Sequence, residues 1–329
     1  MAVTSHDVAR AAGVSQPTVS RALRDDPTIA EATRKRIAEI AASLGYIPSE
    51  VGRSLSKRAT RRIAVIADLD NPLWPMLVDG LHDELIRHNY SMTLLAERGD
   101  PLQFEHQLLS GWADGVIITS ARLTAVLPKK LARRGTPFIL VNRTIEGLEA
   151  DAVVADNVAG SRMAADLLVE AGHTRIGALL GPPDTSTGRD REVGLREQLA
   201  AHGMRLTPRR VLHGPFAYSH GREGLPEILK GRYPPTAVFC ANDIIAIGAL
   251  NTAHALGLKV PDDLALIGFD DLDEASWPVY DLTTIHVPFA EMVRAAVARL
   301  LDRLRDPQLP PRVEVHPVSA VVRATHLSA

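Results

Sequence analysis

The stretch that decides the fold runs from Thr4 to Asp25 and reads TSHDVARAAGVSQPTVSRALRD. Its first four residues begin with threonine and end with aspartate, the spacing of a capping box at the start of a helix. Gly13 supplies a left-handed residue that ends this helix. Ser15 caps a second helix, which tolerates Pro17 in its first turn. Two short helices joined by a turn that contains glycine indicate a helix-turn-helix.

A third helix is expected from about Glu31 to Leu44, because apolar residues recur there on one face and Gly45 follows as a stop. Residues 1–62 hold 11 Lys and Arg and 6 Asp and Glu, a net charge of +5. The remaining residues hold 26 Lys and Arg and 33 Asp and Glu, a net charge of −7. A basic head on an acidic body indicates a polyanionic partner for the head. An unevenly charged surface without a partner explains the same counts.

Beyond Arg62, short apolar runs alternate with helical patterns. Buried strands are expected at 63–67, 115–118, 138–141, 153–155, 176–180, 237–240 and 264–267. Helical patterns lie between most of them, for example over 74–87, 157–171 and 243–256. This alternation predicts a parallel α/β architecture. The number of strand–helix units is too large for one small sheet, so the body is expected to form two lobes.

Several classes of protein are disfavoured by what the chain lacks. No run approaches the roughly 18 apolar residues of a membrane span, and the first ten residues carry no apolar signal core. Cys240 is the single cysteine, which rules out a disulfide within the chain. These features predict a cytoplasmic protein without a membrane partner. Common nucleotide-binding, hydrolase and zinc-protease motifs are missing and the histidines are scattered, so no enzyme, metal site or cofactor is expected.

Short motifs recur together along the head: Val3-Thr4, Asp7-Val8-Ala9, Ala12-Gly13-Val14-Ser15, Thr18-Val19-Ser20-Arg21 and Leu44-Gly45-Tyr46-Ile47-Pro48. The body adds Asp156-Asn157, Gly172-His173, Gly181-Pro182, Ala241-Asn242-Asp243 and Gly268-Phe269-Asp270-Asp271. With these motifs the chain resembles the lactose-repressor/galactose-repressor (LacI/GalR) family over nearly its whole length. The resemblance is strong for the head. In the body it is strong for the fold and weak for the identity of a ligand.

The resemblance implies an α/β protein with a small all-α helix-turn-helix head and a two-lobed, doubly wound α/β domain of the type I periplasmic-binding-protein kind. The head would span residues 1–60, with a hinge helix at about 48–58, and the regulatory domain 61–329. The lobes would be discontinuous. The first would take about 63–155 and 287–318, and the second about 156–286 and 319–329.

In open α/β sheets, ligands bind beyond the carboxyl ends of the strands, here in a cleft shared by both lobes. Mapped by position, the resemblance implies an effector site of Asp68, Leu73, Trp74, Asn142, Arg191, Phe216, Asn242 and Asp270. Carboxylate, amide and guanidinium groups suit sugar hydroxyls, and an aromatic face suits the C–H side of a sugar ring.

Simpler roles stay open for several of these side chains. Trp74 and Phe216 are also compatible with core packing, and Asp270 with capping a turn. Arg191 is also compatible with a surface ion pair to an acidic neighbour in sequence. The resemblance departs from the family pattern at Tyr280-Asp281, where two prolines are usual, and this leaves the geometry of that loop open.

The second helix of the head is expected to enter the major groove of DNA with its first residues facing the bases. Arg21 suits guanine, Gln16 suits adenine, and Pro17 offers an apolar contact. The alternative for Arg21 is a surface ion pair with Asp25. Hydroxyl side chains that suit phosphate oxygens, which set the register of the protein on DNA, are Thr4, Ser15, Thr18 and Ser20.

The hinge carries Arg53 and Leu55. By resemblance it folds into a helix on operator DNA and inserts Leu55 into the minor groove, a wedge that kinks the duplex. Gly52 stands where alanine is usual, and glycine in a helix costs about 1 kcal/mol relative to alanine. The hinge helix is therefore expected to form less readily here. A plain flexible linker is the alternative.

These observations predict a ligand-responsive, sequence-specific transcriptional regulator, a repressor of an operon for a sugar or related carbon source. Its expected partners are double-stranded operator DNA with a pseudo-palindromic sequence, a sugar or sugar derivative as effector, and a second copy of the chain. The chain carries no leucine heptad tail, so a dimer is expected rather than a tetramer. The alternative is a sugar- or nucleoside-binding enzyme, or a binding protein, with a fused DNA-binding head.

Overall fold

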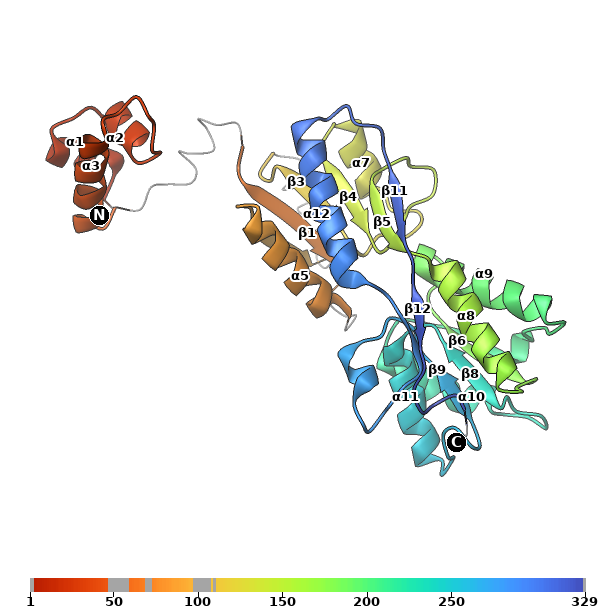
Figure 1. Cartoon of the computed structure of the whole chain (residues 1–329). Helices are drawn as coiled ribbons and strands as arrows, with labels where there is room; N and C mark the ends of the chain where they lie inside the picture. The colour runs from red at the N-terminus through yellow and green to blue at the C-terminus, as the bar shows by residue number, and fades with distance from the viewer. Residues whose placement is uncertain (1–2, 47–58, 69–72, 97–107, 109–110, 328–329) are drawn as a thin grey trace. The chain divides into compact units, whose positions relative to one another are not determined.

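The computed structural model describes residues 3–46, 59–68, 73–96, 108 and 111–327. The chain divides into two compact units, Met1–Thr60 and Arg61–Ala329, which are described separately (Figure 1). The hinge, including Arg53 and Leu55, lies outside the described residues, and so does the side chain of Trp74.

The described part of the head contains three helices: α1 (Ser5–Ala12), α2 (Gln16–Ala22) and α3 (Glu31–Ser43). Their apolar stripes meet in a small core around Val8, Val19 and Ile37, which are fully buried. The predicted helix-turn-helix and the third helix are confirmed.

The helix ends in the head follow from local sequence. Thr4 and Asp7 form the predicted capping box, in which the backbone N–H of Thr4 donates to Asp7 Oδ2 at 3.0 Å. Gly13 ends α1 with a φ of 64°, a conformation that glycine adopts without steric cost. Ser15 caps α2 by accepting the backbone N–H of Thr18 at 3.4 Å.

The first lobe of the body is built on a six-stranded parallel sheet in the order β11-β5-β4-β3-β1-β2. Its strands are β1 (Arg62–Ala67), β2 (Ser91–Ala96), β3 (Gly115–Ile118), β4 (Phe138–Val141), β5 (Ala152–Ala155) and β11 (Val313–His316). The described residues of this lobe form the helices α5 (Leu73–Arg87), α7 (Leu127–Arg133) and α12 (Phe289–Arg305). The central strands β3 and β4 are buried along their whole length, as continuous apolar runs require.

The second lobe holds a four-stranded parallel sheet in the order β7-β6-β8-β9 and an antiparallel pair of β10 with β12. Its strands are β6 (Ile176–Leu180), β7 (Val211–His213), β8 (Ala237–Cys240), β9 (Ala265–Ile267), β10 (Thr284–His286) and β12 (Ser319–Val321). Its helices are α8 (Asn157–Glu170), α9 (Ser186–Ala201), α10 (Tyr218–Ile228) and α11 (Asp243–Ala255), with short 3₁₀ turns η1 (Pro208–Arg210) and η2 (Asp273–Ser276).

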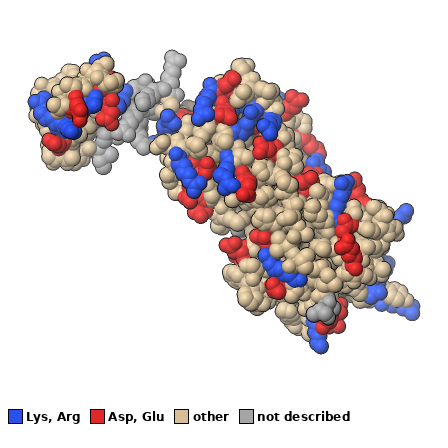
Figure 2. Space-filling model, in the orientation of Figure 1, with Lys and Arg blue, Asp and Glu red and all other residues tan. Residues whose placement is uncertain are grey.

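The chain passes from one lobe to the other after β5, after β10 and between β11 and β12 (Figure 1). The first and third passages lie side by side. His316 of β11 pairs with Ala155 of β5, and the carbonyl oxygen of His316 accepts the backbone N–H of Asp156 at 2.9 Å. In the space-filling view, basic and acidic side chains are interspersed on the body (Figure 2).

The strands and helices predicted for the body are present, with ends that differ by a residue or two. The strand predictions missed β2, β7, β10 and β11, whereas the strand-like run 318–323 near the end of the chain contains β12. β2 and β7 are edge strands, and none of the side chains of β2 is fully buried, so its sequence lacks the continuous apolar run that identifies a central strand. β11 is the opposite edge of the same sheet and alternates exposed and half-buried residues.

Candidate effector cavity and operator-binding surface

A small cavity lies between the lobes, where strands of both sheets end. The first lobe contributes Leu73, Asn142 and Arg143. The second lobe contributes Thr187, Arg191, Phe216, Asn242 and Asp270. The cavity holds only about 10 Å³, close to the space that one water molecule needs. The space among the described lining residues is therefore narrow in this structure.

Three of the polar lining residues follow strands closely. Asn142 comes after β4, Asn242 two positions after β8, and Asp270 three positions after β9. Asn142 and Asp270 have φ values of 70° and 110°, which residues other than glycine rarely adopt. Such strained backbone persists where the surroundings hold it, and it clusters at ligand sites. Asn242 also caps α11 by accepting the backbone N–H of Ile245 at 2.9 Å.

Arg191 is the centre of the polar network. Its side chain is 3% exposed, and each side of its guanidinium is used. Nε donates to Asn157 Oδ1 at 2.8 Å, and Nη1 donates to the carbonyl oxygen of Ala241 at 2.6 Å. Nη2 donates to Asp270 Oδ1 at 2.7 Å. The alternative of a surface ion pair with Asp190 is wrong, because Arg191 is buried and Asp190 pairs with Arg189 instead.

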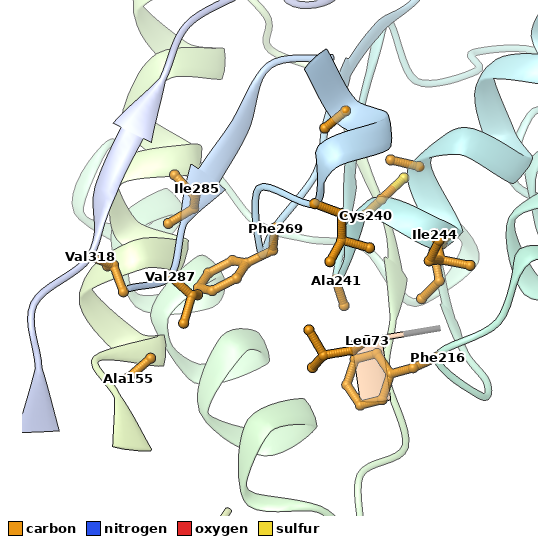
Figure 3. Packing of buried hydrophobic residues seen from close by; sticks show 14 of the residues in the cluster. Leu73, Ala155, Phe216, Cys240, Ala241, Ile244, Phe269, Ile285, Val287 and Val318 are labelled. Atoms are coloured by element: carbon orange, nitrogen blue, oxygen red, sulfur yellow. The ribbon is translucent and has the colours of Figure 1, made fainter. Parts of the chain in front are cut away.

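Aromatic rings enclose this guanidinium. Its Cζ lies 3.8 Å from the centre of the Phe269 ring and 5.9 Å from the centre of the Phe216 ring. A cation is attracted to the face of an aromatic ring, so both contacts stabilise the charged guanidinium. Phe269 is held close to α8 because Gly160 faces it, and a Cβ at that glycine would lie 2.6 Å from the ring. Figure 3 shows Phe216 beside Leu73, which comes from the other lobe.

Two acidic residues lie buried in this region. Burial raises the pKa of Asp270, and Arg191 opposes that shift. Burial also raises the pKa of Asp243, whose carboxylate accepts the backbone N–H of Leu272 at 2.8 Å and the hydroxyl of Thr284. Asp243 thereby braces the loop that presents Asp270.

Asp270 and Asp271 do not act as a pair. Asp270 points at Arg191, whereas Asp271 accepts from Arg323 at 2.7 Å and lies 3.0 Å from Nδ1 of His286. Adjacent residues after a strand point apart, as expected from the alternation of a strand. The two carboxylates are therefore not arranged as the general acid and base of a hydrolase.

Asn142 has a distinctive property. Its side chain is buried, and its Oδ1 has no hydrogen-bond partner among the described residues. A buried acceptor without a donor is rare in folded proteins and carries a desolvation cost. A ligand hydroxyl or amine in the cavity would supply the missing donor.

The structure brings six of the eight predicted effector residues to this cavity: Leu73, Asn142, Arg191, Phe216, Asn242 and Asp270. Asp68 is half-buried and is not among the described lining residues. Sequence reasoning missed Arg143 and Thr187. Thr187 lies four positions before Arg191 on α9, hence on the same helix face, and this spacing was the available signal.

On the head, α2 exposes Pro17 and Arg21. The alternative partner of Arg21 is otherwise engaged, because Asp25 lies 3.9 Å from Nε of Arg34. Within the part of the chain that the structure describes, Arg21 forms no ion pair. The alternative for Arg21, a surface pair with Asp25, is therefore absent among the described residues.

The other polar residues of the head that are predicted to contact DNA already have partners within it. Gln16 donates to Ser5 Oγ at 3.3 Å, a long hydrogen bond. The hydroxyls of Ser15 and Thr18 lie 2.8 Å apart, and the hydroxyl of Ser20 accepts from Arg24.

Across the described residues, no three His, Cys, Asp or Glu side chains are grouped to hold a metal ion. No described helix combines the length and the apolarity that crossing a bilayer requires.

A helix-turn-helix head joined to a two-lobed α/β body with a polar cavity between its lobes defines a ligand-responsive DNA-binding regulator. Residues 4–49 match the model of the bacterial regulatory proteins of the lacI family, and residues 165–326 match a periplasmic binding protein-like domain. The chain is 33% identical to the HTH-type transcriptional repressor CytR of Escherichia coli over 92% of this chain and 90% of that protein. The chain belongs to the lacI family of bacterial regulatory proteins.

Other relatives agree. The HTH-type transcriptional repressor PurR of Aliivibrio salmonicida is 30% identical over 98% of this chain and 99% of its own length. A Lac repressor dimer bound to operator and the anti-inducer ONPF matches the fold with a TM-score of 0.90 at 26% identity, over all of both chains. A complex of the regulator CelR with cellobiose matches with a TM-score of 0.76 at 29% identity, over 98% of this chain and 99% of that chain. The predicted family, fold class and regulatory function are confirmed.

Proposed function

We propose that this transcriptional regulator is a homodimeric cytoplasmic repressor that binds a sugar or sugar derivative in the cavity between its lobes and catalyses no reaction. The effector residues are those that line the cavity: Leu73, Asn142, Arg143, Thr187, Arg191, Phe216, Asn242 and Asp270. Trp74 and Asp68 are proposed to complete the site from the first lobe. The lobe limits given above are part of the same proposal.

One observation carries the proposal. A buried guanidinium and carboxylate, Arg191 and Asp270, lie beside Asn142, whose Oδ1 has no partner among the described residues, and Phe216 adds an aromatic face. This set offers donors, acceptors and an apolar face within one cavity, which is what a sugar needs. A relative of similar fold, CelR, has been solved with cellobiose, and another relative is named a ribose operon repressor.

Binding requires a change in the cavity. Ligand pockets occupy about 300–1,000 Å³, and the cavity between the lobes holds about 10 Å³. The lobes must therefore separate, or the lining side chains must move, before a sugar fits. A ligand that prefers one lobe arrangement shifts the balance between the two by its difference in affinity.

The first test is a thermal-shift screen of sugars, sugar phosphates and nucleosides with the full chain. A ligand that binds only the folded protein raises the unfolding temperature, increasingly so at higher concentration. A hit that also changes operator affinity supports the proposal. A hit that is consumed by the protein favours the alternative of an enzyme with a fused head.

For the head we infer that α2 enters the major groove. Arg21 would read guanine, Gln16 adenine after releasing Ser5, and Pro17 a thymine methyl. Hydroxyls at the ends of the helices would contact phosphates: Thr4, Ser15, Thr18 and Ser20. Arg53 and Leu55 of the hinge are proposed to contact the minor groove.

The hinge provides a prediction. Leu55→Ala should weaken specific operator binding and reduce DNA bending while non-specific binding stays nearly unchanged, because the wedge acts only on a correctly seated complex. Gly52→Ala should tighten operator binding, because alanine favours the helix by about 1 kcal/mol. Gel-shift assays with circularly permuted operator fragments measure both. Equal bending by wild type and Leu55→Ala would exclude the wedge.

The assembly of the protein provides a further prediction. Trp277 and Val279 of the second lobe are 49% and 67% exposed, and Trp277 stacks on Tyr280 with ring centres 6.2 Å apart. Figure 2 shows wide uncharged areas on this lobe. Exposed aromatic and apolar side chains favour a protein interface.

We expect a dimer by light scattering at micromolar concentration, and a monomer for the double variant Trp277→Glu, Val279→Glu. A dimer that survives these changes would place the interface elsewhere, and a wild-type tetramer would contradict the proposed assembly.

A further inference from the structure

The arginines of the second lobe fall into two groups. Residues 156–286 and 319–327 hold 11 arginines. Six of them form an ion pair with an acidic residue: Arg162, Arg189, Arg191, Arg196, Arg222 and Arg323. Within the part of the chain that the structure describes, the other five form none: Arg175, Arg205, Arg209, Arg210 and Arg232. The place where four of these five gather requires an explanation.

The topology of the sheet brings them together. Strands β7, β6 and β8 are parallel neighbours, so all three begin at the same edge of the sheet. Arg175 directly precedes β6, and Arg209 and Arg210 directly precede β7. Arg232 lies in the loop that leads into β8. This edge is at the opposite ends of the strands from the effector cavity, which lies beyond their carboxyl ends.

The loop before β8 joins these segments. Nε of Arg175 donates to the carbonyl oxygen of Pro234 at 3.0 Å, and Nη2 of Arg210 donates to the carbonyl oxygen of Tyr233 at 2.9 Å. Each of these bonds uses one of the five N–H donors of a guanidinium. Cζ of Arg232 lies over the Tyr233 ring, 5.4 Å from its centre. We call Arg175, Arg209, Arg210, Arg232 and Tyr233 the arginine edge.

The arginine edge is positively charged and open to solvent. The stretches 171–183, 198–222 and 228–242 supply it, and they hold seven Lys and Arg but no Asp or Glu. Arg175, Arg209 and Arg232 are exposed, and Tyr233 is 63% exposed although Arg232 lies over its ring. Like charges that lie side by side repel one another, and a bound anion removes that repulsion. The partner of this surface is therefore anionic.

The chemistry of the surface narrows the kind of anion. Guanidinium groups bind phosphate oxygens through pairs of parallel hydrogen bonds. An exposed tyrosine ring offers a face on which a base can stack, and arginine beside it adds a cation–π contact. An acidic protein segment would use the charges and leave the ring without a role. A base can reach the ring only when it is not paired within a duplex.

We propose that the arginine edge is a second nucleic-acid-binding surface, separate from the helix-turn-helix, and that it takes a single-stranded segment. The guanidinium groups hold the phosphates, and a base stacks on Tyr233. The surface lies in the body, whereas the operator-reading residues belong to the head. It rests neither on the identity of the effector nor on the base contacts proposed for the head.

The binding test uses the full chain in the presence of excess unlabelled duplex DNA, which occupies the heads. The probes are fluorescein-labelled 12-nucleotide oligothymidylate and oligouridylate, and fluorescence anisotropy measures their affinity over a range of salt concentrations. We expect wild type to bind at least one of them, more weakly as salt rises. Tighter binding of one probe identifies the strand as DNA or as RNA, because the sugar differs between them.

Two variants separate phosphate contacts from stacking. Arg209→Gln with Arg232→Gln removes two charges and spares Arg175 and Arg210, which hold the loop. Affinity should fall roughly tenfold or more, and the salt slope should decrease by roughly 0.7 for each phosphate contact that is lost. Tyr233→Ala should weaken binding roughly five-fold to a hundred-fold and leave the salt slope unchanged, because stacking releases no counter-ions.

The matched control is the double variant Arg162→Gln, Arg222→Gln. It changes the net charge by the same amount in the same lobe, but Arg162 pairs with Glu197 at 2.6 Å and Arg222 with Glu223 at 2.7 Å. Its affinity for the probes should equal that of wild type.

Three results would overturn the proposal. Neither oligonucleotide binds to wild type, or both bind equally well to wild type and to the arginine variant, which would assign the binding to the head. In the third, polyglutamate displaces the probe as effectively as unlabelled oligonucleotide and Tyr233→Ala binds like wild type, which would make the edge a surface for an acidic protein. None of these results bears on whether the effector is a sugar.

Discussion

Replacing Arg191 with alanine is expected to abolish the response of operator binding to the effector, while operator binding without effector stays at the wild-type level. The guanidinium makes three hydrogen bonds inside the cavity and belongs to the body, not to the head that binds DNA. A hydrogen bond from this charged group to the effector would contribute about 1.5–3 kcal/mol, so without it effector affinity should fall roughly 10-fold to 100-fold or more.

Because coupling between two sites is reciprocal, a ligand that no longer binds can no longer loosen or tighten DNA. The measurement is operator affinity with and without the effector found in the thermal-shift screen. A wild-type response would remove Arg191 from the ligand site and leave it a purely structural residue.

The same substitution has a cost for stability that only the structure reveals. Asp270, itself buried, would lose its counter-ion, and breaking a buried pair in this way costs roughly 3–5 kcal/mol. The pKa of Asp270 is already raised by burial and would rise further without Arg191. A carboxyl with a raised pKa in the folded state binds protons on folding, so the stability of the variant should recover relative to wild type as the pH falls.

The double variant Arg191→Ala, Asp270→Asn separates the two effects. It removes both charges, so it should regain most of the lost stability at neutral pH and still fail to respond to the effector. Thermal unfolding between neutral and mildly acidic pH measures the first part, and operator titration measures the second. A single variant as stable as wild type at neutral pH would show that Asp270 does not depend on Arg191.

Arg21→Ala is expected to weaken binding to the best operator by about 1–3 kcal/mol and to relax the preference at one base pair in each half-site. The side chain is exposed on α2 and, among the described residues, is not engaged in an ion pair, so it is available for a base. Binding to a library of operator variants measures both quantities at one salt concentration.

Lys35→Ala is the matched control. It removes one positive charge from the head, on α3, where Lys35 pairs with Glu31 at 3.2 Å. The loss of a phosphate contact weakens binding equally on all operator sequences and lowers the salt dependence of that binding, without altering the base preference. If Arg21→Ala behaved in that manner too, Arg21 would be a phosphate contact and the base-reading role would be wrong.

Features that depend on neighbours in sequence were predictable. The capping residue Thr4, the left-handed Gly13 and the cap Ser15 act within four positions of the groups they satisfy, so a single segment carries the whole signal. The central strands were predictable for a similar reason. A strand buried on both faces must be apolar throughout, and β3 and β4 are.

The sequence by itself determined the helix-turn-helix, the alternation of strands and helices, and, through the family resemblance, which residues gather at one cavity. It did not determine what those residues bond to. Arg191 meets Asp270 from 79 positions away, and Arg122 meets Asp184 from 62. At such separations local spacing carries no information, and an arginine beside Asp190 and Glu192 is as compatible with a surface ion pair as with a buried one. Only the packing of the second lobe, which brings distant segments of the chain together, placed Asp270 and two phenylalanine rings around Arg191.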